Sequence, residues 1–326
     1  MKLIVAGYTA APADAQAAAL YYDRLFELAT ADGLEFAWGG PATASKLAPI
    51  LARMPQDWVI TINDIPAVWR ACSENPLFGL ASPDAQGRAA AVGMLRDIAK
   101  AVRTLNDLAG RRVVEAVEIH SAPGFDKRVL HPEGSALAAG LREAAAIEWD
   151  GCALVLEHCD AFSPRHKPAK GFLPLAEEIA VLQGLPGHPV TLGLNWGRSM
   201  IEVRDADRVL DHVRAGAASG VMSAMTFSGT AAQDNVFGEA YLDSHLPFAD
   251  PLDATYAEPA SGMTMARVAE ALPLLPDLRF IAIKTNWPAA RTDPAERAAS
   301  VAANFDTLVR LLEHEPRLAR ALGFVA

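Results

Sequence analysis

The stretch CALVLEHCD, Cys152–Asp160, decides how this chain folds, because a short apolar run closes abruptly on polar residues. Seven other segments have the same plan, and a helical stretch follows each: Lys2–Tyr8, Leu34–Trp38, Trp58–Asn63, Val113–His120, Val190–Trp196, Val221–Phe227 and Phe280–Trp287. Apolar strands that alternate with helices predict a parallel sheet buried on both faces. Eight such units in a chain of 326 residues predict one closed (β/α)8 TIM barrel.

Helices are expected between the strands, at Ala13–Ala31, Ala42–Arg53, Ala85–Asn106, Gly134–Glu148, Leu173–Leu182, Ala206–Ala215, Thr264–Ala271 and Pro294–Leu322. No linker divides the chain, so residues 1–326 are expected to form a single TIM barrel domain. Two loops after strands are long, at about 160–173 and 228–262. Such loops overhang the open end of a barrel as lids or specificity elements, and they serve equally well as contacts in a homodimer.

Charge and composition exclude several classes of protein. The net charge of −10 disfavours nucleic acid and anionic membranes as partners, because both attract a basic surface. No apolar run has membrane-spanning length, and the run in Met1–Tyr8 is too short for a secretory signal, so a soluble cytoplasmic protein is expected. The three cysteines form no Cys-x-x-Cys pair, which gives no indication of a disulfide framework or a thiolate zinc site.

Ionisable residues terminate buried strands, and Glu157 and Lys284 each follow four apolar residues. An unpaired charge there bears a large desolvation cost, so each requires a partner or a function. We expect both side chains to face one cavity at the barrel mouth. They either form a structural ion pair, or Glu157 is a general base or metal ligand while Lys284 neutralises a developing enolate. A Schiff base on Lys284 is a third alternative.

Strand four adds two candidates. Glu118 and His120 are two residues apart, so the period of a strand places both on one face, which we expect to point inward. His120 has two alternative roles. It acts as a second catalytic acid or base, or it is a structural histidine whose ring nitrogens are hydrogen-bonded within the fold. His158, directly after Glu157, is expected to contribute to substrate binding.

Aromatic residues suggest a carbohydrate ligand. Trp38, Trp196 and Trp287 end three predicted strands, and tryptophan rings suit the apolar face of a sugar. Each could instead pack under a loop. Asn195 with Trp196 is expected to hold the substrate. Arg198 could bind a carboxylate or phosphate group bidentately, in which case the sugar would be acidic or phosphorylated.

Glu157 at the end of strand five, the aromatic strand ends and the chain length resemble the xylose isomerase-like TIM barrel superfamily, which contains sugar isomerases, epimerases, hydroxypyruvate isomerase and endonuclease IV. Three segments, Ile4–Thr9, Glu157–His158 and Lys284–Trp287, resemble more narrowly a bacterial family in that superfamily, a domain of unknown function.

The resemblance implies a divalent ion held by Glu, Asp or Glu, His and Glu on successive strands. Only Glu157 matches this set: Asn195 stands at the second position, Thr226–Ser228 at the third, and Lys284 at the last. One carboxylate beside an amide and an ammonium group would hold Mg²⁺ or Mn²⁺ poorly. No cofactor is therefore expected and a divalent metal is disfavoured; if one binds, Glu157 is the expected ligand.

A competing set for a different metal site consists of Glu118, His120, Glu157, His158 and Asp160. The favoured interpretation is a sugar isomerase or epimerase-like enzyme that abstracts a proton next to the carbonyl of a small carbohydrate without a metal. In it Glu157 is the base, Lys284 the electrostatic stabiliser and His120 a second acid or base. One alternative is a non-catalytic carbohydrate-binding barrel with a degenerate metal site. Another is a glycoside hydrolase using Glu118 and Glu157.

Overall fold

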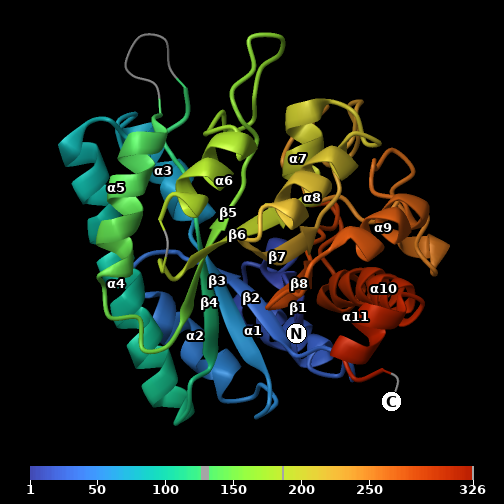
Figure 1. Cartoon of the computed structure of the whole chain (residues 1–326). Helices are drawn as coiled ribbons and strands as arrows, with labels where there is room; N and C mark the ends of the chain where they lie inside the picture. The colour runs from blue at the N-terminus through green and yellow to red at the C-terminus, as the bar shows by residue number, and fades with distance from the viewer. Residues whose placement is uncertain (126–131, 186, 325–326) are drawn as a thin grey trace.

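The computed structural model describes residues 1–125, 132–185 and 187–324. Eight parallel strands close into one barrel in sequence order (Figure 1). Their bounds are β1 Lys2–Val5, β2 Gly33–Ala37, β3 Val59–Asn63, β4 Val114–Ile119, β5 Ala153–Glu157, β6 Val190–Asn195, β7 Met222–Phe227 and β8 Phe280–Ile283. The barrel closes where Lys2 pairs with Phe280 and Val5 with Ile283. The predicted fold and all eight strands are confirmed, with some strand ends shorter than expected.

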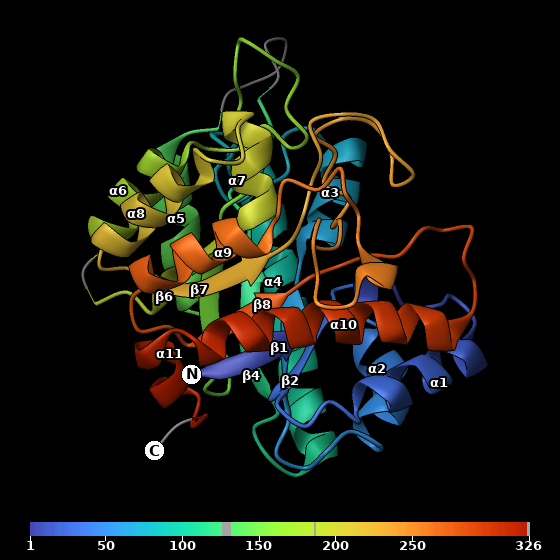
Figure 2. The ribbon, with the colours of Figure 1, turned by 90° about the vertical axis from the view of Figure 1, so that its right-hand side faces the viewer.

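Helices surround the barrel (Figures 1 and 2). Those predicted are α1 Ala15–Leu25, α2 Thr43–Leu51, α4 Ala85–Ala109, α5 Gly134–Ala145, α6 Leu175–Gln183, α8 Val209–Ala218, α9 Met265–Ala271, α10 Pro294–Glu313 and α11 Pro316–Ala321. The prediction of one continuous last helix is wrong. Helix α10 ends at Glu313, and a new helix begins at Pro316 with Glu315 as its N-cap. Within the described ranges, no helix is long and apolar enough to cross a membrane.

Two further helices, α3 Ile65–Glu74 and α7 Trp196–Val203, were not expected. Both begin within two residues of a strand end, so the sequence has no loop segment there that would indicate a new helix. The side chain of Asn195 caps α7 by accepting a hydrogen bond from the backbone N–H of Arg198 at 3.3 Å. The predicted strand Val190–Trp196 therefore ends one residue early, and Arg198 lies in the first turn of a helix instead of in a loop.

Alternation along the strands sorts the core into two layers. On β5, Leu154 and Leu156 pack outward against the helices, whereas Val155 lies inside the barrel. The interior cluster also contains Ile4, Val59, Ala116, Ala224, Phe280 and Ala282. These side chains fill the lumen below the mouth, so polar residues of the same parity are left at the carboxyl ends of the strands.

The two long loops lie over that end of the barrel. Residues 158–174 connect β5 to α6, and residues 228–264 connect β7 to α9. The second loop is held by two-way backbone hydrogen bonds between Gly229 and Leu246, and the N–H of Asn286 donates to the carbonyl of His245 at 2.6 Å. The described part of this loop is therefore packed down against the strand ends.

Candidate active site

Six strands deliver polar side chains to the lumen at their carboxyl ends, just below the barrel mouth. They are Glu35 from β2, Asn63 from β3, Glu118 from β4, Glu157 from β5, Asn195 from β6 and Lys284 directly after β8, and none is more than 1% exposed. Each continues the inward parity of its strand. The expectation that Glu118, Glu157 and Lys284 point inward therefore agrees with their positions in the structure.

Glu157 is the centre of this cluster. Its Oε2 atom accepts hydrogen bonds from Asn63 at 2.7 Å and lies 2.6 Å from Nη1 of Arg198, while its Oε1 accepts from Asn195 at 3.0 Å. Burial raises the pKa of Glu157, but Arg198, the hydrogen bond with His120 and the charge of Lys284 outweigh burial and hold that pKa well below its usual range. The carboxylate is therefore ionised at neutral pH.

The pKa of Glu118 is shifted in the opposite direction from that of Glu157, although the two carboxyl groups lie close together. Nδ2 of Asn63 donates to Oε2 of Glu118 at 3.0 Å as well as to Glu157, so one amide bridges the two carboxyl groups. Burial, followed by the charges of Glu35 and Glu157, raises the pKa of Glu118 well above its usual range. The two carboxyl groups that share the Asn63 amide thus have pKa values shifted in opposite directions, an arrangement typical of an acid and base pair.

Lys284 pairs with Glu35, with Nζ 2.6 Å from Oε1 and both side chains fully buried. The alternative of a direct ion pair between Lys284 and Glu157 is therefore wrong. Nζ also lies 4.8 Å from the centre of the Tyr8 ring. Burial lowers the pKa of Lys284, but Glu35, Tyr8 and Glu157 raise it well above its usual range, which keeps the amine charged and disfavours a Schiff base.

His120 joins the cluster from above β4. Its Nδ1 lies 2.6 Å from Asp64, and its Nε2 lies 3.1 Å from Glu157 and equally far from Arg198. Burial lowers the pKa of His120, but Cys159 and the hydrogen bond to Asp64 raise it well above its usual range. Nε2 of His120 therefore lies between Glu157 and Arg198, where the ring can exchange a proton with the cluster, while Asp64 orients it through Nδ1.

Arg198 connects the lumen with the loops. Its guanidinium is fully buried, and its Nε lies 3.4 Å from Oδ2 of Asp243, which also lies 3.1 Å from Nζ of Lys170. A cavity of about 990 Å³ begins beyond this row of alternating charges, and its lining includes Trp69, Lys167, Lys170, Arg204, Tyr241 and Asp243. Nε and Nη2 of Arg198 make no hydrogen bond with any described residue. The buried cation therefore keeps free donors.

The predicted tryptophans are buried instead of lining that cavity. Trp38 is 2% exposed, Trp196 packs against Phe227 with ring centres 6.3 Å apart, and Trp287 packs against Tyr256 at 5.4 Å. The indole N–H groups of Trp196 and Trp287 have no hydrogen-bond partner in the described part of the chain. Trp69 on α3, 47% exposed, lines the cavity instead.

The competing metal set does not assemble. His158 follows the outward parity and bonds to Glu178 at 2.7 Å and Glu202 at 3.1 Å, outside the lumen. Asp160 accepts backbone hydrogen bonds from Ala169 at 2.7 Å and from Lys170 at 3.0 Å, which fixes the loop after β5. Only Glu118, His120 and Glu157 of the five lie together, so this alternative is wrong.

The metal positions implied by the superfamily do not fit a divalent ion here. Asn195 turns its amide nitrogen, which cannot ligate, toward Glu157. The oxygens of Glu157 are occupied by two amides and a guanidinium group, and Lys284 stands at the last ligand position. Hard cations require several anionic oxygens, whereas this cluster presents buried cations in their place.

Sequence reasoning missed Glu35, Asn63 and Asp64. Glu35 carries the same signal as Glu157, a lone carboxylate among the apolar residues of a strand, and could have been found by it. Asp64 precedes the unexpected helix α3 and gave no signal of its own.

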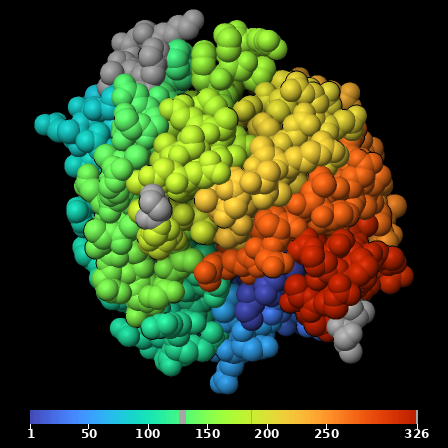
Figure 3. Space-filling model, viewed as in Figure 1, coloured from blue at the N-terminus to red at the C-terminus, as the bar shows by residue number. Residues whose placement is uncertain are grey.

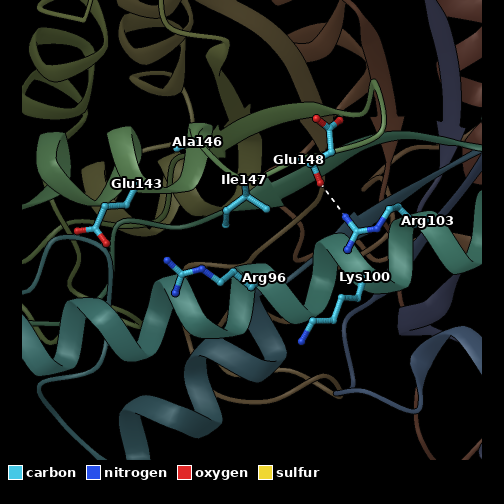
Figure 4. A pocket seen from close by; sticks show the side chains of 7 residues that line it. All are labelled: Arg96, Lys100, Arg103, Glu143, Ala146, Ile147 and Glu148. Atoms are coloured by element: carbon cyan, nitrogen blue, oxygen red, sulfur yellow. Dashed lines mark hydrogen bonds between the residues drawn. The ribbon is translucent and has the colours of Figure 1, made fainter.

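A second hollow, of about 310 Å³, lies far from this site (Figure 4). It lies between α4, which contributes Arg96 and Arg103, and the end of α5 with the residues that follow it, and Arg103 donates to the carbonyl of Glu148 at 2.9 Å. Since Glu148 leads into the start of β5, this hollow is at the end of the barrel opposite the strand ends. It has no connection with the carboxylate cluster.

Comparisons with known proteins agree with this architecture. A protein from Rhodospirillum rubrum named as a xylose isomerase superimposes with a TM-score of 0.64 at 14% identity, covering 95% of this chain and 99% of that one. An L-ribulose 3-epimerase superimposes with a TM-score of 0.61 at 17% identity, covering 98% and 97%. At these identities the likeness shows the fold, which is that of xylose isomerase-like TIM barrels.

One sequence relative, an uncharacterised protein of Salmonella typhimurium, is 37% identical over 200 residues, which span 61% of this chain and 62% of that relative. The match to a family model is longer and covers residues 4–300. The chain therefore belongs to the family described as Domain of unknown function (DUF4862).

Proposed function

We propose that this protein is a sugar isomerase or epimerase-like enzyme that moves a proton next to the carbonyl of a small carbohydrate, without a divalent ion in the lumen. One observation carries the proposal: Glu118 and Glu157 share the amide of Asn63, while their pKa values are shifted in opposite directions. A reaction that removes a proton from carbon and returns one needs an ionised and a protonated group at the same centre.

Glu157 accepts the carbon-bound proton in this mechanism, and Glu118 or His120 returns a proton to the enolate. The interactions that keep Glu157 ionised also weaken it as a base. As negative charge develops on the enolate oxygen, Arg198 turns its free N–H donors toward that oxygen. Because Arg198 then stabilises the Glu157 carboxylate less, the proton affinity of Glu157 rises. Lys284 supplies a second fixed positive charge against the same oxygen.

The ligand is proposed to be a sugar because proteins of this fold include an L-ribulose 3-epimerase and because the lumen offers many hydrogen-bonding groups in a small volume. Free donors on Arg198 suit an acidic or phosphorylated sugar. Since Glu157 and Lys284 are buried, the substrate reaches them only when the contact between Lys170 and Asp243 opens.

The test is deuterium exchange into sugars. A panel of ketoses, aldoses, their phosphates and sugar acids is incubated with the enzyme in D2O and followed by NMR. Wild-type protein is expected to introduce one deuterium next to the carbonyl of at least one sugar, whereas Glu157→Gln loses this exchange. Glu115→Gln is the matched control, because Glu115 is on β4 but contacts Arg279 outside the lumen at 2.5 Å. Equal exchange by wild type and Glu157→Gln would refute the assignment.

A second candidate, a carbohydrate-binding barrel without catalysis, is favoured by the tight pairing of Glu157 with Arg198 at 2.6 Å. It predicts that a sugar raises the melting temperature of the protein while no deuterium enters that sugar. Thermal-shift measurements on the same panel therefore separate the two functions.

A further inference from the structure

A second cluster of chemistry-bearing side chains lies outside the lumen, behind the carboxylate site. His158 follows β5 and points outward, Glu202 is near the end of α7, and His212 is on α8. One ligand atom from each lies within 4.8 Å of the others. The proposed reaction uses none of these residues, although two imidazoles and a carboxylate are common ligands of transition metals.

The spacing of the three groups fits a small tetrahedral site. Nε2 of His158 lies 3.1 Å from Oε2 of Glu202, and Nε2 of His212 lies 3.7 Å from Oε1 of the same carboxylate. Ligands at zinc bond lengths are about 3.4 Å apart when arranged tetrahedrally. Both separations are close to that value, and they run to the two different oxygens of the Glu202 carboxylate.

An outer layer of hydrogen bonds already orients these ligands. Nδ1 of His158 lies 2.7 Å from Glu178, which in turn accepts a short hydrogen bond from Ser121, and this leaves Nε2 of His158 directed at Glu202. The backbone N–H of Ala161 donates to Glu202 at 2.8 Å. A carboxylate behind a histidine ligand fixes its tautomer and ring orientation in metal sites.

We propose that His158, Glu202 and His212 bind one Zn²⁺ ion, or a transition-metal ion of similar preference, at a site separate from the lumen. Three protein ligands leave the fourth position to water. One carboxylate and two imidazoles suit Zn²⁺ and disfavour Mg²⁺ and Ca²⁺, which require oxygen ligands.

The site is accessible and has a structural consequence. The Glu202 side chain is 19% exposed and that of His212 13%, so an ion can arrive from solvent without opening the barrel mouth.

Helices α5, α6, α8 and α9 cover the barrel on the face shown in Figure 3. Glu202 is one helical turn beyond Arg198 on α7, and His158 adjoins Glu157. A bound ion would therefore link β5, α7 and α8 outside the lumen, without a contact to Glu157 or Arg198.

The experiment measures metal binding to the full chain, prepared without a histidine tag and freed of metals by a chelator. Zn²⁺ is titrated by calorimetry, and Co²⁺ by the visible absorption typical of tetrahedral coordination. One ion per chain is expected for the wild type. His212→Gln, at a partly exposed ligand, is expected to weaken binding by more than 100-fold, and Glu178→Gln, behind His158, by about 10- to 100-fold.

Two further variants make the test specific. His314→Gln is the matched control, because His314 is an exposed histidine that contacts only the carbonyl of Arg310 among the described residues, at 2.6 Å. Glu157→Gln tests the lumen. Both are expected to bind the ion as the wild type does. The proposal is overturned if the wild type binds no ion, if His212→Gln binds as tightly as wild type, or if Glu157→Gln abolishes binding.

Discussion

Removal of the Lys284 ammonium group should destabilise the fold strongly, because Glu35 would then be a buried charge without a partner. Nζ of Lys284 lies 2.6 Å from Oε1 of Glu35, and both side chains are 0% exposed. Breaking a buried pair by removing one partner costs about 3–5 kcal/mol. Lys284→Met keeps most of the side-chain volume, so the expected loss in free energy of unfolding is electrostatic.

The measurement is urea-induced unfolding followed by circular dichroism, with a second pair as control. Nζ of Lys2 lies 3.3 Å from Asp32, and these side chains are 37% and 34% exposed, so Lys2→Met should cost only about 0–1 kcal/mol. The double variant Lys284→Met with Glu35→Leu should recover most of the loss, because it removes both charges. A cost for Lys284→Met as small as that for Lys2→Met would refute the reasoning. If Lys284→Met fails to fold, a folded double variant gives the same information.

Three other predictions concern pH and the loops. The exchange rate should fall in acid as Glu157 gains a proton and in alkali as Glu118 loses one, and Glu118→Gln should change the alkaline limb; an alkaline limb unchanged in Glu118→Gln would contradict the acid and base pair. Burial lowers the pKa of His245 from 6.5 to about 3, so this residue stabilises the fold above pH 6.5 and loses that contribution as pH falls toward 3; unfolding curves of His245→Gln should therefore depend less on pH in that window than those of wild type. Lys170→Met removes the contact with Asp243 and should speed proteolysis of residues 228–262, whereas unchanged proteolysis would show that this contact does not hold the loop.

The strands were predictable because their pattern is local. Leu154 and Leu156 face the helices and Val155 the lumen, and a run such as ALVLE is typical of a strand buried on both faces. The same parity placed Glu118 and Glu157 inside the barrel correctly. It also applied to Glu35, which sequence reasoning overlooked within β2.

Pairing between distant segments could not be read from the sequence. Lys284 and Glu35 are 249 residues apart, and nothing local distinguishes Glu35 from Glu157 as the partner. Helix α7 was hidden because Asn195 ends a strand and caps a helix at once, so no loop separates the two. The placement of Arg198 beside Glu157 depends on that helix, which is why the sequence predicted a substrate contact for Arg198 but not its ion pair with Glu157.

The central claim is that the buried cations Arg198 and Lys284 serve where related barrels are expected to use a metal charge. Its most direct test is the rate of deuterium exchange into the identified sugar before and after exhaustive chelation, with metal content measured in the same samples. The rate should be unchanged when no divalent ion remains, and Lys284→Met should abolish it. Loss of exchange on chelation and its recovery on adding a divalent ion, both in the wild type and in His212→Gln, would contradict the claim.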